Sequence, residues 1–144
     1  MRILTILLSL LLTSTVYAQQ FKAFGDFQLH YIALDTTTLS PEVAKKAGLP
    51  RSEKIGFFNV SLLDMSQSDD GVPVEPAAIK LSVTNLLQQD LPLDLVIHKE
   101  GIAIYYLAMF QKYHEDILWF KIDFQLPGQT QWLSHKFSQK VYIQ

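Results

Sequence analysis

The stretch Leu118-Trp-Phe-Lys-Ile-Asp-Phe-Gln-Leu126 carries the clearest structural signal in the chain. Every second residue, from Leu118 to Leu126, is large and apolar. Because successive side chains of a β-strand point to opposite faces, this alternation predicts a strand with one face in a hydrophobic core. Pro127-Gly128 follows directly and should end the strand, since proline cannot donate a hydrogen bond to a sheet ladder.

A β-hairpin is predicted upstream of this strand, with Leu91–Lys99 and Ile102–Phe110 flanking a two-residue loop, Glu100-Gly101. In that register both strands place apolar residues on the same face. The predicted pairs are Ile97 with Ile104, Leu95 with Tyr106 and Leu93 with Ala108. Val96, His98 and Tyr105 would then point to the opposite face.

The remaining segments complete a β-rich pattern. Further strands are predicted at Asp26–Leu34, Lys54–Leu63, Ala78–Leu87 and Trp132–Tyr142. A short helix is expected near 40–48, where Ser40 can cap, Pro41 can occupy the first helical position and Gly48 can end the helix. Asp64–Pro76 is predicted to be a mobile loop and Lys112–Asp116 a polar turn.

About seven short strands, one helix and no internal repeat predict an all-β domain. The expected architecture is an antiparallel two-sheet sandwich of the immunoglobulin-like kind, with a small barrel as the alternative.

The first 18 residues have the three parts of a cleavable secretory signal peptide. Arg2 precedes the apolar run Ile3–Leu12, and Val16 and Ala18 are the small residues that a signal peptidase accepts. The run is too short to span a bilayer, which takes about 20 apolar residues. We therefore expect cleavage before Gln19, and a single domain over residues 19–144.

The composition indicates the cellular compartment of the protein and excludes some classes of partner. The chain has no cysteine, and an exported chain without disulfides is typical of a bacterial periplasm. Without Arg2 the exported chain has 11 Lys and Arg against 14 Asp and Glu, and no basic cluster longer than Lys45-Lys46. Nucleic acid is therefore not an expected partner. No stable membrane insertion is expected after signal cleavage.

Neither a catalytic residue nor a cofactor or metal site is predicted. No Gly-x-Ser-x-Gly elbow, His-Glu-x-x-His helix or phosphate-binding glycine loop is present, and the 6 glycines are scattered. The four histidines lie far apart in the sequence, and without cysteine a blue-copper site is excluded. His114 is expected in a solvated turn, whereas His30, His98 and His135 are expected on strand faces opposite the better apolar stripes.

Several polar residues stand out within the predicted strands and junctions. Asn59 and Asn85 are expected to hydrogen-bond to backbone at a bulge or sheet edge. Arg51 follows the stiff Leu49-Pro50 junction and could hold an anionic group of a partner, or instead pair internally with an acidic residue. The predicted partner-binding residues are Arg51, His30 and Glu100.

The linear pattern resembles a family of small secreted proteins of Gram-negative bacteria that is known only as a domain of unknown function. The resemblance extends from about Phe21 to Tyr142. It implies a periplasmic setting and supports an all-β domain, but it implies no activity or cofactor. The residues that carry it are Phe24-Gly25, His30-Tyr31, Leu39 to Ala44, Arg51-Ser52, Asn59-Val60, Asn85-Leu86-Leu87 with Gln89, and Glu100 followed by Ala103-Ile104-Tyr105-Tyr106.

The leading functional hypothesis is a non-catalytic periplasmic module that binds a protein, a peptide or another envelope component. The binding surface would be a sheet edge, or a groove near the helix and the Asp64–Pro76 loop. The alternatives are an enzyme of unrecognised type, and a small-molecule or metal binder that uses strand-face histidines.

Overall fold

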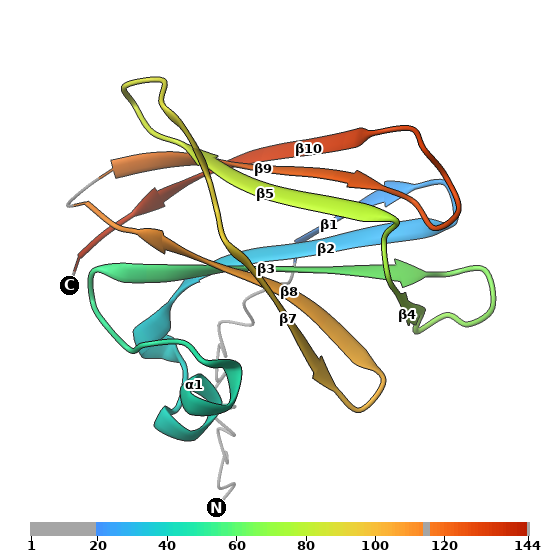
Figure 1. Ribbon diagram of the computed structural model, residues 1–144, viewed down its shortest axis with the longest axis horizontal. Helices are drawn as coiled ribbons and strands as arrows, with labels where there is room; N and C mark the ends of the chain where they lie inside the picture. The colour runs from blue at the N-terminus through green and yellow to red at the C-terminus, as the bar shows by residue number, and fades with distance from the viewer. Residues whose placement is uncertain (1–19, 114–115, 144) are drawn as a thin grey trace, which may run out of the picture.

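Two antiparallel β-sheets pack face to face in the computed structural model, which describes residues 20–113 and 116–143 (Figure 1). The predicted signal peptide, its cleavage before Gln19, and His114 lie outside the described residues. The first sheet has the strand order β1-β2-β3-β8-β7 with β4 beside β3, and the second has the order β10-β9-β5-β6. The strands are β1 Gln20–Phe24, β2 Phe27–Asp35, β3 Ile55–Asp64, β4 Val72–Val74, β5 Ala78–Thr84, β6 Asp90–Pro92, β7 Leu95–Glu100, β8 Ala103–Gln111, β9 Asp116–Gln125 and β10 Leu133–Val141.

The predicted all-β sandwich is confirmed, but with ten strands in the described part of the chain rather than seven. The three additional strands are β1, β4 and β6, all of them short or exposed. β4 lies within the segment predicted to be a mobile loop, and pairs with the end of β3. The predicted strand Leu91–Lys99 is divided, because β6 belongs to the second sheet and β7 to the first.

The hairpin of β7 and β8 is confirmed, with a register two residues away from the predicted one. Ile97 pairs with Tyr106 and Leu95 with Ala108, so the loop is Gly101-Ile102. Gly101 has a φ of 60°, which suits glycine at the first central position of a two-residue hairpin turn. A shift of two residues leaves every side chain on its predicted face, because the pleat repeats every two residues.

The core lies between the two sheets, and its centre is aromatic. Phe120 of β9 is fully buried, and its ring centroid lies 5.0 Å from that of Phe58, 5.0 Å from that of Phe110 and 5.1 Å from that of Phe137. The whole apolar stripe of β9 and the residue after it is buried, which confirms the prediction from the alternation. Its members are Leu118, Phe120, Ile122, Phe124 and Leu126.

The connection from β2 to β3 contains a 3-10 turn, η1 (Thr36–Thr38), and the helix α1 (Pro41–Ala47). Ser40 accepts a hydrogen bond from the Val43 N–H, and Gly48 ends the helix with a φ of 69°, as predicted. The buried hydroxyl of Thr36 accepts a hydrogen bond from the Ser52 N–H at 2.9 Å. This bond holds the start of the connection, before α1, against its end, after α1. Figure 1 shows α1 beside the first sheet, on the side away from the second sheet. No helix in the described ranges is long and apolar enough to cross a membrane.

Two polar side chains lie deeper than the sequence predicted. Lys112, assigned to a polar turn, is buried: its Nζ lies 2.6 Å from Asp35 Oδ1 and 2.8 Å from the Tyr142 carbonyl oxygen. His135 was expected opposite the apolar stripe of its strand, but it shares the inner face of β10 with Phe137, and its ring centroid lies 4.6 Å from that of Tyr31. Because side chains alternate along β10, His135 lies on the same face as Leu133 and Phe137. The expectation that His135 lies opposite the apolar stripe was therefore wrong.

Candidate functional site

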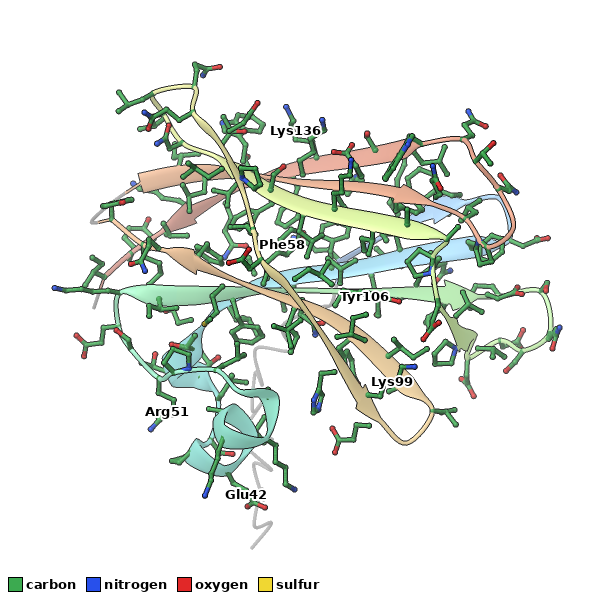
Figure 2. The ribbon with its side chains drawn as sticks, in the orientation of Figure 1. Glu42, Arg51, Phe58, Lys99, Tyr106 and Lys136 are labelled. Carbon is green, nitrogen blue, oxygen red and sulfur yellow. The ribbon has the colours of Figure 1, made fainter. Side chains whose placement is uncertain are left out.

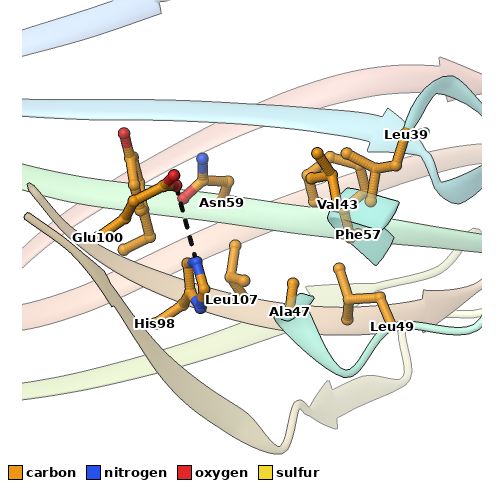
Figure 3. A pocket seen from close by; sticks show the side chains of 10 residues that line it. Leu39, Val43, Ala47, Leu49, Phe57, Asn59, His98, Glu100 and Leu107 are labelled. Carbon is orange, nitrogen blue, oxygen red and sulfur yellow. Dashed lines mark ion pairs between the residues drawn. The ribbon is translucent and has the colours of Figure 1, made fainter. Parts of the chain in front are cut away.

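An open groove of about 250 Å³ lies on the outer face of the first sheet, between α1 and the β7–β8 hairpin (Figure 3). Side chains from α1 and its flanks form one wall, and side chains from three neighbouring strands form the floor and the other wall. The lining residues are Leu39, Val43, Ala47, Leu49, Phe57, Asn59, His98, Glu100, Tyr105 and Leu107.

The groove exists because β3 and β8 are apolar on both faces at this point. Phe58 faces the core, while its neighbour Phe57 faces α1 and is also buried. Phe57 and Leu107 form a second hydrophobic cluster with Leu49, which follows the helix. The helix covers only part of this outer face, and Val43 on its surface remains 49% exposed. The consecutive Phe57-Phe58 pair is the sequence signal that could have predicted a second buried face.

The groove is polar at one end and apolar at the other. Figure 3 shows His98, Glu100 and Asn59 together at one end, and Leu39, Val43 and Leu49 at the other. His98 Nε2 lies 3.9 Å from Glu100 Oε2, and the Glu100 side chain is 76% exposed. The polar end therefore has a carboxylate, an imidazole and an amide side chain beside apolar walls.

Asn59 departs from its sequence prediction. Its Oδ1 is buried and has no hydrogen-bond partner among the described residues, so the expectation of a backbone bond is wrong for this atom. Asn85 does bond to backbone, but in a turn rather than at a bulge: its Oδ1 accepts from the N–H groups of Leu87 and Gln89 at 3.0 and 3.1 Å. An unsatisfied buried acceptor costs about 1–3 kcal/mol.

We expect Asn59→Leu to raise the free energy of unfolding by about 1–3 kcal/mol, since an apolar side chain of similar size removes the unsatisfied acceptor. The measurement is the urea midpoint. Asn85→Leu is the matched control and should lower the midpoint, because it removes two hydrogen bonds to the turn backbone. A lower midpoint for Asn59→Leu would show that Asn59 stabilises the fold.

His30 lies in a neighbouring pocket of about 180 Å³ on the same outer face. Its Nε2 is 3.0 Å from Gln28 Oε1, and its ring stacks on Phe21 at 5.3 Å between centroids. Tyr105 lines both this pocket and the groove. His30 and Glu100 thus border adjacent hollows of one surface.

Arg51 lies outside both hollows. It is exposed beside α1 and points away from the sheets in Figure 2, and its Nη2 donates to the Thr37 carbonyl oxygen at 3.2 Å. That hydrogen bond is to backbone, whereas the internal alternative considered from the sequence was a pair with a carboxylate. The structure therefore brings together Glu100 and His98, places His30 next to them, and separates Arg51 from all three.

Sequence reasoning missed the apolar part of the groove. Each of its residues, taken singly, is an ordinary apolar residue of a strand or helix. Within the described ranges, no three His, Cys, Asp or Glu side chains are close enough to hold a metal ion. The groove itself has one histidine and one carboxylate, fewer than the three or four protein ligands of a zinc site. Such a groove can bind a ligand that has an apolar group next to a hydrogen-bond donor.

Two histidines make the stability of the protein depend on pH. Burial lowers the pKa of His30, and burial followed by the charge of Lys22 lowers the pKa of His135. In the unfolded chain both return to about 6.5, so the unfolded state binds more protons as the pH falls below that value. Their contribution to stability is therefore complete above about pH 6.5 and declines on acidification.

We expect the urea midpoint to fall between about pH 7.5 and about pH 5.5, and to fall less in His135→Phe. His135→Phe removes one of the two titrating groups and keeps an aromatic ring against Tyr31. Lys136→Ala, at an exposed position next to it, is the control and should keep the full pH dependence. An equal fall in His135→Phe and in the unmodified protein would contradict the assignment to His135.

The fold and the site define a class: a two-sheet β-sandwich with an amphipathic groove on the outer face of one sheet. Within that class the chain belongs to the family described as "Domain of unknown function (DUF4426)", whose sequence pattern matches residues 21–144. The resemblance seen in the sequence is thereby confirmed. No curated protein matches the chain significantly.

Solved structures share the fold, and one of them belongs to the same family. A DUF4426 family protein from Pseudomonas aeruginosa PAO1 is 29% identical and superposes with a TM-score of 0.74 over 88% of this chain and 96% of the other. FetP of uropathogenic Escherichia coli strain F11, expressed recombinantly, superposes with a TM-score of 0.61 at 10% identity, over 86% and 93% of the two chains. A copper-bound variant of FetP has a TM-score of 0.56 at 9% identity, over 86% and 95%. The likeness to FetP concerns the fold alone.

Proposed function

We propose that this protein is an exported, non-catalytic binding module of the periplasm, and that the groove holds an apolar group of a partner protein, peptide or other envelope component. The observation that carries the proposal is the groove itself, in which a buried, unsatisfied Asn59 Oδ1 lies beside open apolar walls. Keeping such an acceptor costs stability, and a ligand that donates to it recovers that cost. A surface that served only to cover the core would gain from an apolar residue at position 59.

Export rests on the sequence of residues 1–18 and on the family resemblance. We further propose that residues 19–144 form one domain, since the family pattern spans 21–144 and the two described sheets share one core.

The exported form is predicted to begin at Gln19, because Val16 and Ala18 are the well-placed small residues after the apolar run. Mass spectrometry of the amino terminus of protein isolated from the producing cells is the measurement. Ala18→Arg should block cleavage, whereas Gln20→Ala should leave it unchanged. Protein that retains Met1 and sediments with membranes would contradict export as proposed here.

The predicted partner-binding residues enter this proposal unequally. Glu100 borders the groove and His30 borders the adjoining pocket, which supports a contact of both residues with a ligand that covers this face. Arg51 stays a prediction for a contact outside the groove, with an anionic group of the same partner. The copper of the FetP variant is not carried over to this chain, because at 9% identity the likeness extends to the fold only.

Affinity capture with paired surface variants tests the proposal. Val43→Asp introduces a charge into the groove wall, and Leu87→Asp introduces the same charge at another exposed apolar residue, in the turn between β5 and β6. Both positions are exposed, so both variants should fold, with changes of about 0.5 kcal/mol or less. We expect a partner captured from periplasmic extract to be lost with Val43→Asp only. Equal retention by the two variants would overturn the role of the groove.

A further inference from the structure

The polar end of the groove is built to receive a donor or a cation. Asn59 Oδ1 is a buried acceptor without a partner among the described residues, and Glu100 adds a carboxylate within the same lining. The Tyr105 ring borders the same hollow, and the face of an aromatic ring attracts cations. None of the described lysines and arginines lines the groove, and the lining group nearest to the Glu100 carboxylate is His98, whose Nε2 lies 3.9 Å from Glu100 Oε2.

The apolar end of the groove limits the size of the apolar group that a bound ligand can carry next to its donor or cation. The groove of about 250 Å³ is smaller than the about 300–1,000 Å³ of sites that enclose drug-sized ligands. Phe57 and Leu107 form its apolar floor, and Leu39 and Val43 border it from the helix side. This space suits one aliphatic side chain next to a small cation.

The position of the polar end favours a polypeptide as the source of both groups. His98 and Glu100 belong to β7, which is the last strand of its sheet among the described residues. The outer edge of β7 therefore has backbone N–H and C=O groups that no described strand pairs with. An extended segment leaving the groove there can add to the sheet by backbone hydrogen bonds.

We propose that the groove binds the free amino terminus of a polypeptide whose first residue is aliphatic. The α-ammonium group faces Glu100 and donates to Asn59 Oδ1, an oxygen that is buried in the structure and that the amide must turn toward the groove on binding. The first side chain packs on Phe57 and Leu107, and the next residues follow the edge of β7. An α-amino group has an ordinary pKa of about 7.7–8.0, so it is mostly charged at neutral pH. The inference rests on the proposed function, because it names the group that the proposed groove would hold.

Titration with synthetic peptides, followed by NMR and calorimetry, tests the inference. The probes are leucyl-alanyl-alaninamide, its N-acetylated form, glycyl-alanyl-alaninamide and leucinamide alone. We expect the free leucyl peptide to bind about tenfold more tightly than the acetylated one, a difference of about 1.4 kcal/mol, since acetylation removes the charge of the donor. The glycyl peptide and leucinamide should both bind more weakly than the leucyl peptide, and the shifted signals should include Asn59 and Leu107.

The outcomes separate this inference from the proposed function. Equal binding of the free and acetylated leucyl peptides overturns amine recognition and leaves an apolar groove. Equal binding of the leucyl and glycyl peptides, or no shift in the groove with any probe, overturns the groove itself. Leucinamide binding as tightly as the tripeptide overturns the polypeptide source in favour of a free amine.

Two variants and a control check the assigned acceptors. Asn59→Leu should remove most of the preference for the free amine, and it is expected to fold because it is predicted to be more stable than the unmodified protein. Glu100→Gln should lower the affinity a few-fold and weaken its dependence on salt, as expected for an exposed carboxylate. Glu42→Gln, on α1 but outside the groove lining, should change neither. An unchanged amine preference in Asn59→Leu contradicts the proposal.

Discussion

Replacing Phe120 with alanine is expected to lower the free energy of unfolding by about 3–5 kcal/mol. Phe120 is fully buried, and its ring lies against three other phenylalanine rings from both sheets. Truncation at this point removes apolar surface from the core and leaves a cavity that the surrounding strands can close only in part. The urea midpoint and slope measure the effect.

Lys121→Ala is the matched control on the same strand. Lys121 points to the other face of β9, is 42% exposed, and its Nζ lies 3.4 Å from Asp123 Oδ2. Exposed ion pairs of this kind usually change stability by less than about 0.5–1 kcal/mol. Similar midpoints for the two variants would show that β9 does not face the core as described.

The second large effect is expected at Asp35. The Lys112 side chain is 1% exposed, and Asp35 is the carboxylate that neutralises it. Asp35→Ala leaves a buried ammonium that has, among the described residues, only the Tyr142 carbonyl oxygen as an acceptor. Breaking a buried pair from one side costs about 3–5 kcal/mol. This contact also ties the residues after β10 to the end of β2, so the carboxyl-terminal segment should loosen.

A double variant distinguishes the buried charge from simple loss of packing. Adding Lys112→Met to Asp35→Ala removes the unpaired charge and keeps the length of the side chain, so the double variant should be more stable than Asp35→Ala alone. Independent effects would instead make the double variant the least stable of the set. That outcome would mean that the ammonium is not buried in the way described.

The sequence predicted an element correctly where one local pattern, such as an alternation or a helix cap, decides its structure. The alternation around Phe120 predicted β9 and its buried face, and the cap, proline and glycine around α1 predicted both ends of the helix. The face of each residue in the β7–β8 hairpin was also predicted correctly. Its register was not, because pairs two residues apart satisfy the same alternation and the turn backbone decides between them.

What the sequence did not predict depends on contacts between distant segments. β4 and β6 are three residues long, too short for a periodic signal. The buried Lys112 pairs with Asp35, which lies far away in the sequence. The groove has the same origin. Phe57 and Leu107 form the floor of the groove from two different strands, and the helix that forms its wall packs against them only in the folded protein.

Site-specific photocrosslinking in living cells tests the central claim, that the groove is where a partner binds. A benzophenone amino acid replaces Val43 on the groove wall or, in a second strain, the exposed Leu87 outside it. The account predicts a discrete covalent adduct from position 43, absent from position 87 and lost when Asn59→Leu is combined with the probe at 43. No adduct from position 43, or the same adduct from both positions, would contradict it.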